Sequence, residues 1–111
     1  MLTFLFLKPF IILQMHQVYI LYSKEIDNFY IGSSSNLEVR KSFHDAKKGA
    51  FYAKRASDWE VYFTIDCISK TQSLLIERHV KKMKSVVYIR NLKFYPEMSE
   101  KLLLKYGQSG C

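Results

Sequence analysis

The chain has 111 residues, of which 49% are hydrophobic and 24% charged, with 17 Lys and Arg residues against 10 Asp and Glu residues. This composition predicts one small folded domain. It excludes a disordered chain and also an enzyme with a deep cavity for a large nucleotide cofactor. The formal net charge of +7 favours a polyanionic partner, because Lys and Arg gain free energy from phosphate contacts and counterion release. We therefore expect nucleic acid as the partner, ahead of an anionic membrane surface.

The two cysteines, Cys67 and Cys111, have no Cys or His partner at metal-site spacing. This excludes a disulfide framework and a structural zinc site, and it is typical of a protein from the reducing cytoplasm. Residues 1–14 are mostly apolar, but Lys8 and Pro9 interrupt them, and they are shorter than the roughly 20 residues that span a bilayer. We interpret them as an extension before a single domain over residues 15–111, with Met15 as the expected start of translation and no stable membrane association.

The chain after Met15 begins with two short runs of β-branched and aromatic residues, at 18–22 and 29–32. The polar residues 23–28 between them are rich in turn formers, so the pattern predicts a β-hairpin. Ser35 and Glu38 then fit a capping box, which predicts a helix from there to Lys48. Gly49 suits the left-handed position that ends a helix.

A basic loop over residues 49–58 leads to a third expected strand at 59–65. Ser69 and Gln72 repeat the capping-box spacing and predict a helix that runs to about Lys84. Two further helical stretches are expected at 86–95 and 97–106, on either side of Pro96, and they form a helical tail. The fold class is therefore α+β: a small, mostly antiparallel three-stranded sheet flanked by helices.

Five side chains in this pattern could carry chemistry, although each also has an ordinary structural explanation. Tyr19 and Tyr30 are typical amphipathic strand residues. Arg40 and His44 share a helix face and would also suit a solvated basic edge. Glu77 lies at the margin of an apolar helix stripe, where it could simply pair with Lys81.

The order of these residues resembles the GIY-YIG nuclease domain. The resemblance rests on the run from Gln17 to Leu21, then Tyr30-Ile31-Gly32, then Asn36-Leu37 followed by Arg40, with His44 one turn later. The strand that begins at Trp59 and the helix that carries Glu77 extend the likeness to about residues 17–92. It is similar to small stand-alone bacterial members related to the nuclease module of excision repair.

The resemblance implies a divalent-metal-dependent endonuclease that hydrolyses DNA phosphodiester bonds. Glu77 would hold one Mg²⁺ or Mn²⁺, since magnesium often takes only one or two protein carboxylates. Arg40 would grip the scissile phosphate with its planar guanidinium. Tyr19 would be the general base and Tyr30 would orient water or phosphate. His44 is the alternative base, because it titrates near neutrality.

Other residues are expected to support this site. Gly32 has a structural task, such as allowing a turn or a close approach of phosphate. A nucleic-acid-binding patch is expected from four cations around the basic loop: Lys47, Lys48, Lys54 and Arg55. We expect a monomer that selects DNA structure rather than a long sequence, in repair or recombination. The alternative is a binding module of the same fold whose catalysis is weak or lost.

Overall fold

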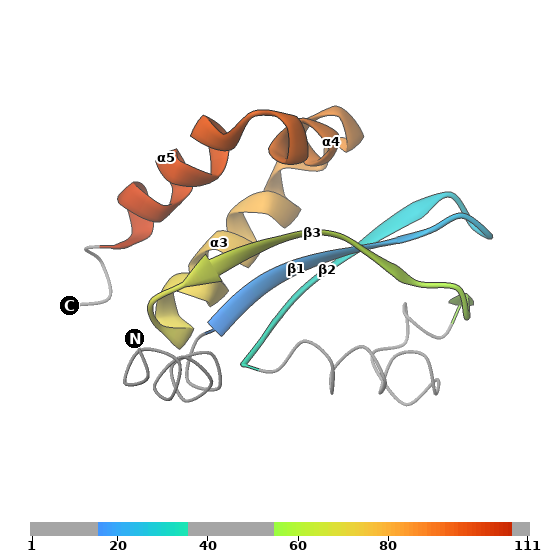
Figure 1. Ribbon diagram of the computed structural model, residues 1–111, viewed down its shortest axis with the longest axis horizontal. Coiled ribbons are helices and arrows are strands. Elements are labelled where there is room, and N and C mark those ends of the chain that lie inside the picture. The colour runs from blue at the N-terminus through green and yellow to red at the C-terminus, as the bar shows by residue number, and fades with distance from the viewer. Residues whose placement is uncertain (1–15, 36–54, 108–111) are drawn as a thin grey trace, which may run out of the picture.

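The computed structural model describes residues 16–35 and 55–107 (Figure 1). Three strands come first in these ranges: β1 (His16–Ser23), β2 (Asn28–Ser34) and β3 (Glu60–Cys67). Three helices follow: α3 (Lys70–Met83), α4 (Val86–Phe94) and α5 (Pro96–Gly107). The predicted α+β class with a three-stranded antiparallel sheet and flanking helices is confirmed. The predicted helix after Ser35, the extension over 1–14 and Gly49 lie outside the described residues.

The strand order is β2-β1-β3, so β1 is central and β2 is an edge strand of the described sheet. Both pairings are antiparallel, and the register places Tyr19 of β1 between Gly32 of β2 and Thr64 of β3. The β1–β2 connection is the short turn that the sequence predicted. Its last residue, Asp27, has a φ of 47°, a left-handed conformation that Asp tolerates better than most side chains.

The two faces of the sheet pack against different partners. Helices α3, α4 and α5 cover one face, as Figure 1 shows, where alternate strand residues such as Val18 and Ile20 contact Ile76 of α3 and Leu92 of α4 in the main core. The opposite face carries a smaller cluster of four buried residues: Tyr19, Leu21, Ala56 and Trp59. Since successive strand residues point to opposite faces, the β1 register assigns Tyr19 to the face without these helices.

The start of α3 fits the predicted cap at Ser69 but uses Gln72 differently. The Ser69 hydroxyl accepts from the Gln72 amide at 3.1 Å, as expected. The Gln72 side chain, however, accepts from the Ile68 amide at 2.8 Å and donates to the Leu103 carbonyl at 3.0 Å. Because Gln72 is buried between two helices, its amide satisfies the backbone of α5 as well as that of its own helix start.

Asp58 fixes the β1–β2 turn from a distant part of the chain. Its carboxylate accepts from the buried Ser23 hydroxyl at 2.6 Å and from the Glu25 amide at 2.9 Å. The hydrogen bond from Ser23 is the main reason that the pKa of Asp58 lies below its ordinary value of 3.8. The charged form of Asp58 therefore stabilises the turn that joins the first two strands.

We predict that Asp58→Asn lowers stability at neutral pH and flattens the acid limb of the stability profile. A carboxyl whose pKa is depressed by folding contributes stability above its unfolded pKa and loses that contribution as the pH falls through its folded pKa. Urea unfolding from about pH 7 down to about pH 2 should show the wild type losing more stability below about pH 4 than the variant does. Equal slopes for the two proteins in acid would contradict this role.

Candidate active site

The phenol of Tyr19 lies across the backbone of Gly32. A Cβ atom added to Gly32 would meet the Tyr19 Oη at 2.6 Å and its Cζ at 2.7 Å, both closer than real Cβ contacts. Gly32 lies inside β2, and no described glycine has a positive φ, so it serves no turn in this structure. Its lack of a side chain instead leaves room for the Tyr19 ring.

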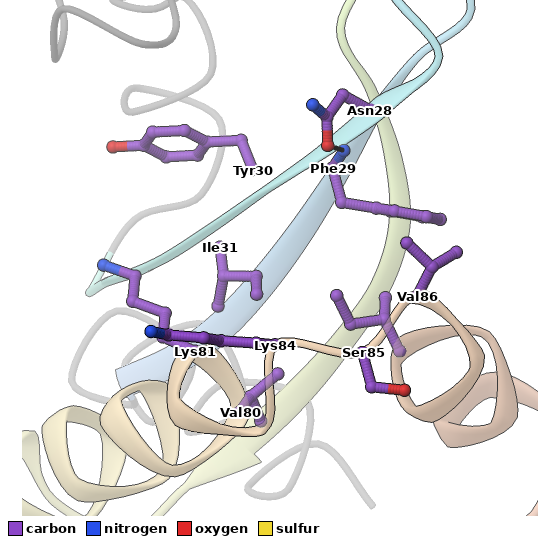
Figure 2. A pocket seen from close by; sticks show the side chains of 10 residues that line it. Asn28, Phe29, Tyr30, Ile31, Val80, Lys81, Lys84, Ser85 and Val86 are labelled. Atoms are coloured by element: carbon purple, nitrogen blue, oxygen red, sulfur yellow. Dashed lines mark hydrogen bonds between the residues drawn. The ribbon is translucent and has the colours of Figure 1, made fainter.

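Tyr30 extends this aromatic face toward solvent. Its ring stacks near that of Tyr19, with centroids 6.4 Å apart, and meets the edge of Trp59 at 6.1 Å. Tyr19 is fully buried, with 0% of its surface exposed, whereas Tyr30 is half-buried. In Figure 2 the Tyr30 ring lies on the side of β2 away from Ile31, which points toward α3. Of the two phenols, Tyr30 is therefore the one that an incoming molecule can reach.

Glu77 lies on α3, on the helix-covered side of the sheet. Its Oε1 accepts from the Ser33 hydroxyl at 2.7 Å, and its Oε2 pairs with the Lys81 ammonium at 2.6 Å. The side chain of Glu77 is 17% exposed and that of Lys81 is 53% exposed. The ion pair is the one that helix spacing suggested, whereas Ser33 was missed. Strand alternation puts Ser33 on the same face as Ile31, which is the signal that could have indicated it.

The Tyr19 hydroxyl and the Glu77 carboxylate contact neighbouring residues of β2 from opposite faces of the sheet. The Tyr19 hydroxyl meets Gly32, and the Glu77 carboxylate meets Ser33, whose Cα is about 3.8 Å further along the strand. The structure thus does not gather Tyr19, Tyr30 and Glu77 in one cavity. It places them on both sides of the edge strand.

A hollow of about 410 Å³ opens beside this edge, between β2 and the junction of α3 and α4 (Figure 2). Ile31 and Val80 form part of its apolar floor. Lys81 and Lys84 bring two ammonium groups to its lining, so the space next to the Glu77 ion pair is positively charged at its rim.

The remaining predicted site residues are only partly within the described chain. Arg40 and His44 lie outside it, as do Lys47, Lys48 and Lys54 of the expected nucleic-acid patch. Arg55 is described and exposed. The positions of these side chains relative to Glu77 therefore remain sequence predictions.

Two observations narrow the chemistry available here. Residues 16–35 and 55–107 contain no group of three or more His, Cys, Asp or Glu side chains that could share a metal ion. Burial raises the pKa of the Cys67 thiol to about 11, so this cysteine is a packing residue and not a nucleophile.

Comparison with known proteins shows the family to which the chain belongs. The family model described as the GIY-YIG catalytic domain matches residues 15–88, well over half of the chain. The chain therefore belongs to the GIY-YIG family, which is a family of endonucleases.

A curated relative is the UPF0213 protein OB0043 of Oceanobacillus iheyensis, which is 28% identical over 81 residues. The matched region covers 73% of this chain and 93% of that protein. The comparison with solved structures gave no significant match. Among the described helices, none has the length and apolar character needed to cross a bilayer.

We predict that Gly32→Ala lowers the free energy of unfolding by about 1–3 kcal/mol, because the new methyl group collides with the buried Tyr19 ring. Denaturant unfolding measures the change. The matched control is Gly107→Ala, where the new Cβ would lie 3.3 Å from the Gln72 side-chain nitrogen, which can shift. In a Tyr19→Ala background the Gly32→Ala change should cost much less. If Gly32→Ala lowers the free energy of unfolding equally in both backgrounds, the Tyr19 ring is not the cause of the loss.

Proposed function

We propose that this protein is a divalent-metal-dependent endonuclease that hydrolyses DNA phosphodiester bonds with selectivity for DNA structure, in repair or recombination. The observation that carries the proposal is that Tyr19 and Glu77 contact adjacent residues of the edge strand β2, Gly32 and Ser33, within a chain that belongs to the GIY-YIG family. We further propose that it acts as a monomer in the cytoplasm, as a single domain over residues 15–111.

The residues at Glu77 fit a divalent cation. Its Oε2 is aimed at a cation already, since the Lys81 ammonium lies 2.6 Å away, and the Ser33 hydroxyl holds the other oxygen in place. Lys81 is half-exposed, so turning it aside costs only about 0–1 kcal/mol. A bound Mg²⁺ or Mn²⁺ would supply charge stabilisation at a phosphate oxygen. Glu77 would hold it together with water molecules, as magnesium sites with few protein ligands do.

The other side chains supply the remaining parts of the reaction. Arg40 grips the scissile phosphate as its charge rearranges. Tyr19 is the general base that the family resemblance implies, with His44 as the alternative. Because Tyr19 is fully buried, the half-buried Tyr30 is better placed to touch the attacking water, and Tyr19 supports it from behind.

DNA suits the charge and size of this chain. The net charge of +7 favours a phosphate backbone over a neutral ligand. The expected patch of Lys47, Lys48, Lys54 and Arg55 would add phosphate contacts near the site. A domain of 111 residues offers little area for reading bases, which favours recognition of a flap, nick or branch.

A second candidate function is a binding module of the same fold that no longer cuts DNA. Two observations favour it: the full burial of Tyr19 and the Lys81 ammonium that neutralises Glu77. Incubation of the purified protein with branched and nicked DNA plus Mg²⁺ or Mn²⁺ separates the two functions. Cutting supports the enzyme, whereas tight binding without cutting supports the module.

We predict that Glu77→Gln reduces cleavage by about 100-fold or more, because the amide keeps an acceptor for Ser33 but loses the charge that holds the metal. Single-turnover cleavage of branched DNA measures the loss. Glu60→Gln, which removes an exposed carboxylate from the start of β3, should leave the rate unchanged. A Glu77→Gln protein that cuts at the wild-type rate would rule out Glu77 as the metal ligand.

We also predict that Lys81→Ala lowers the Mg²⁺ concentration needed for half-maximal cleavage, since the ammonium no longer competes for the Glu77 carboxylate. A magnesium titration of the cleavage rate at saturating DNA measures it, with Lys70→Ala at the exposed start of α3 as the control. A higher magnesium requirement in the variant would count against competition between the two cations.

A further inference from the structure

Helices α3 and α5 enclose a second hollow of about 460 Å³, separate from the one beside β2. Three cations line it: Arg78 and Lys82, one turn apart on α3, and Lys105 from α5. The apolar side chain of Leu75 and the half-buried Tyr106 complete much of the lining. None of the described residues that line it is acidic, so the hollow concentrates positive charge from two helices.

In the described part of the chain, neighbouring carboxylates do not neutralise these cations. Within residues 16–35 and 55–107, no carboxylate lies in ion-pair distance of Arg78, Lys82 or Lys105. The acidic residue nearest to Arg78 and Lys82 in sequence, Glu77, pairs with Lys81. The Lys105 ammonium lies 5.4 Å from the centre of the Tyr106 ring, which holds it near the hollow.

The ring of His79 also lines the α3–α5 hollow. Its Nδ1 lies 2.8 Å from the Tyr106 hydroxyl, and its ring lies beside that of Tyr88. Because Tyr106 belongs to α5, this contact ties together the two helices that carry the three cations.

The hollow shares a lining residue with a smaller hollow at Glu77. That smaller hollow, of about 280 Å³, is lined by Leu74, Glu77, Arg78 and Lys81, and Arg78 also lines the α3–α5 hollow. Cationic side chains therefore follow one another from the neighbourhood of Glu77 across α3 to Lys105.

We propose that the α3–α5 hollow is an accessory nucleic-acid site that binds the sugar-phosphate backbone of a DNA segment extending from Glu77. The identification of the polymer as DNA rests on the proposed function, whereas the anion site rests on the three cations. DNA fits better than an acidic peptide, because Arg78 lines both this hollow and the smaller one at Glu77, where a phosphate would be cut. Such a second contact would let the domain hold two arms of a branched molecule.

The test compares two triple variants with equal loss of charge. The first is Arg78→Ala/Lys82→Ala/Lys105→Ala, and the control is Lys24→Ala/Lys70→Ala/Arg90→Ala, which removes exposed cations from other surfaces. Binding of a branched DNA is measured in EDTA over a salt series, so no cleavage occurs. Each lost phosphate contact should reduce the slope of log K against log salt by about 0.9.

We expect the slope to fall by about 2–3 in the first variant and by less than about 1 in the control. Equal slopes for the two variants would overturn the proposal, including the case in which the hollow binds an acidic protein. Circular dichroism verifies that both variants are folded, and Gln in place of Ala provides a second set if one is not. If the wild-type protein binds DNA but does not cut it, that result contradicts the proposed function and leaves the accessory site intact.

Discussion

The contact between the Tyr19 ring and the bare backbone of Gly32 is the constraint on which the candidate site depends. It exists only in one register of β1 against β2, because a slip of one residue would turn Tyr19 toward the helices and Val18 away from them. The same register aligns Tyr30 with Trp59 on the outer face and turns Ser33 toward α3. A single pairing therefore fixes the phenols, the glycine and the partner of the carboxylate together.

A site built around a strand edge suits the size of this chain. The proposed catalytic groups Tyr19 and Glu77, which contact β2 from opposite faces, need no deep cavity, which a thin two-layer domain could not enclose. An edge strand also lies at the margin of the sheet, where a long polymer can approach both faces at once. The arrangement is thus better matched to a phosphate backbone that passes along the edge than to a small molecule that must be surrounded.

The sequence predicted the fold well because most of its signals are local. The hairpin, the Ser69 cap and the break at Pro96 each depend on a few neighbouring residues, and all three agree with the structure. The bonds of Glu77 to Ser33 and of Gln72 to Leu103 join residues 44 and 31 positions apart. They depend on how α3 packs against β2 and α5, which periodicity does not specify.

The burial of Tyr19 was unpredictable for a related reason. One face of an antiparallel sheet is often solvated, whereas here Trp59 and Ala56, among the described residues, pack on this face beside the buried Tyr19. The roles of Arg40 and His44 stay predictions, because their residues are outside the described ranges.

The electrostatics of α3 link these parts into one argument about metal and DNA. The helix presents a single carboxylate, Glu77, beside the cations Arg78 and Lys81. In the proposed reaction a divalent cation at Glu77 would displace the Lys81 ammonium, which then becomes available to a phosphate. Metal binding would therefore strengthen DNA binding, and by thermodynamic reciprocity DNA would strengthen metal binding. The ion pair between Glu77 and Lys81 at first suggests a site without catalytic activity. In the proposed reaction, however, this ion pair couples the binding of the metal ion to the binding of DNA.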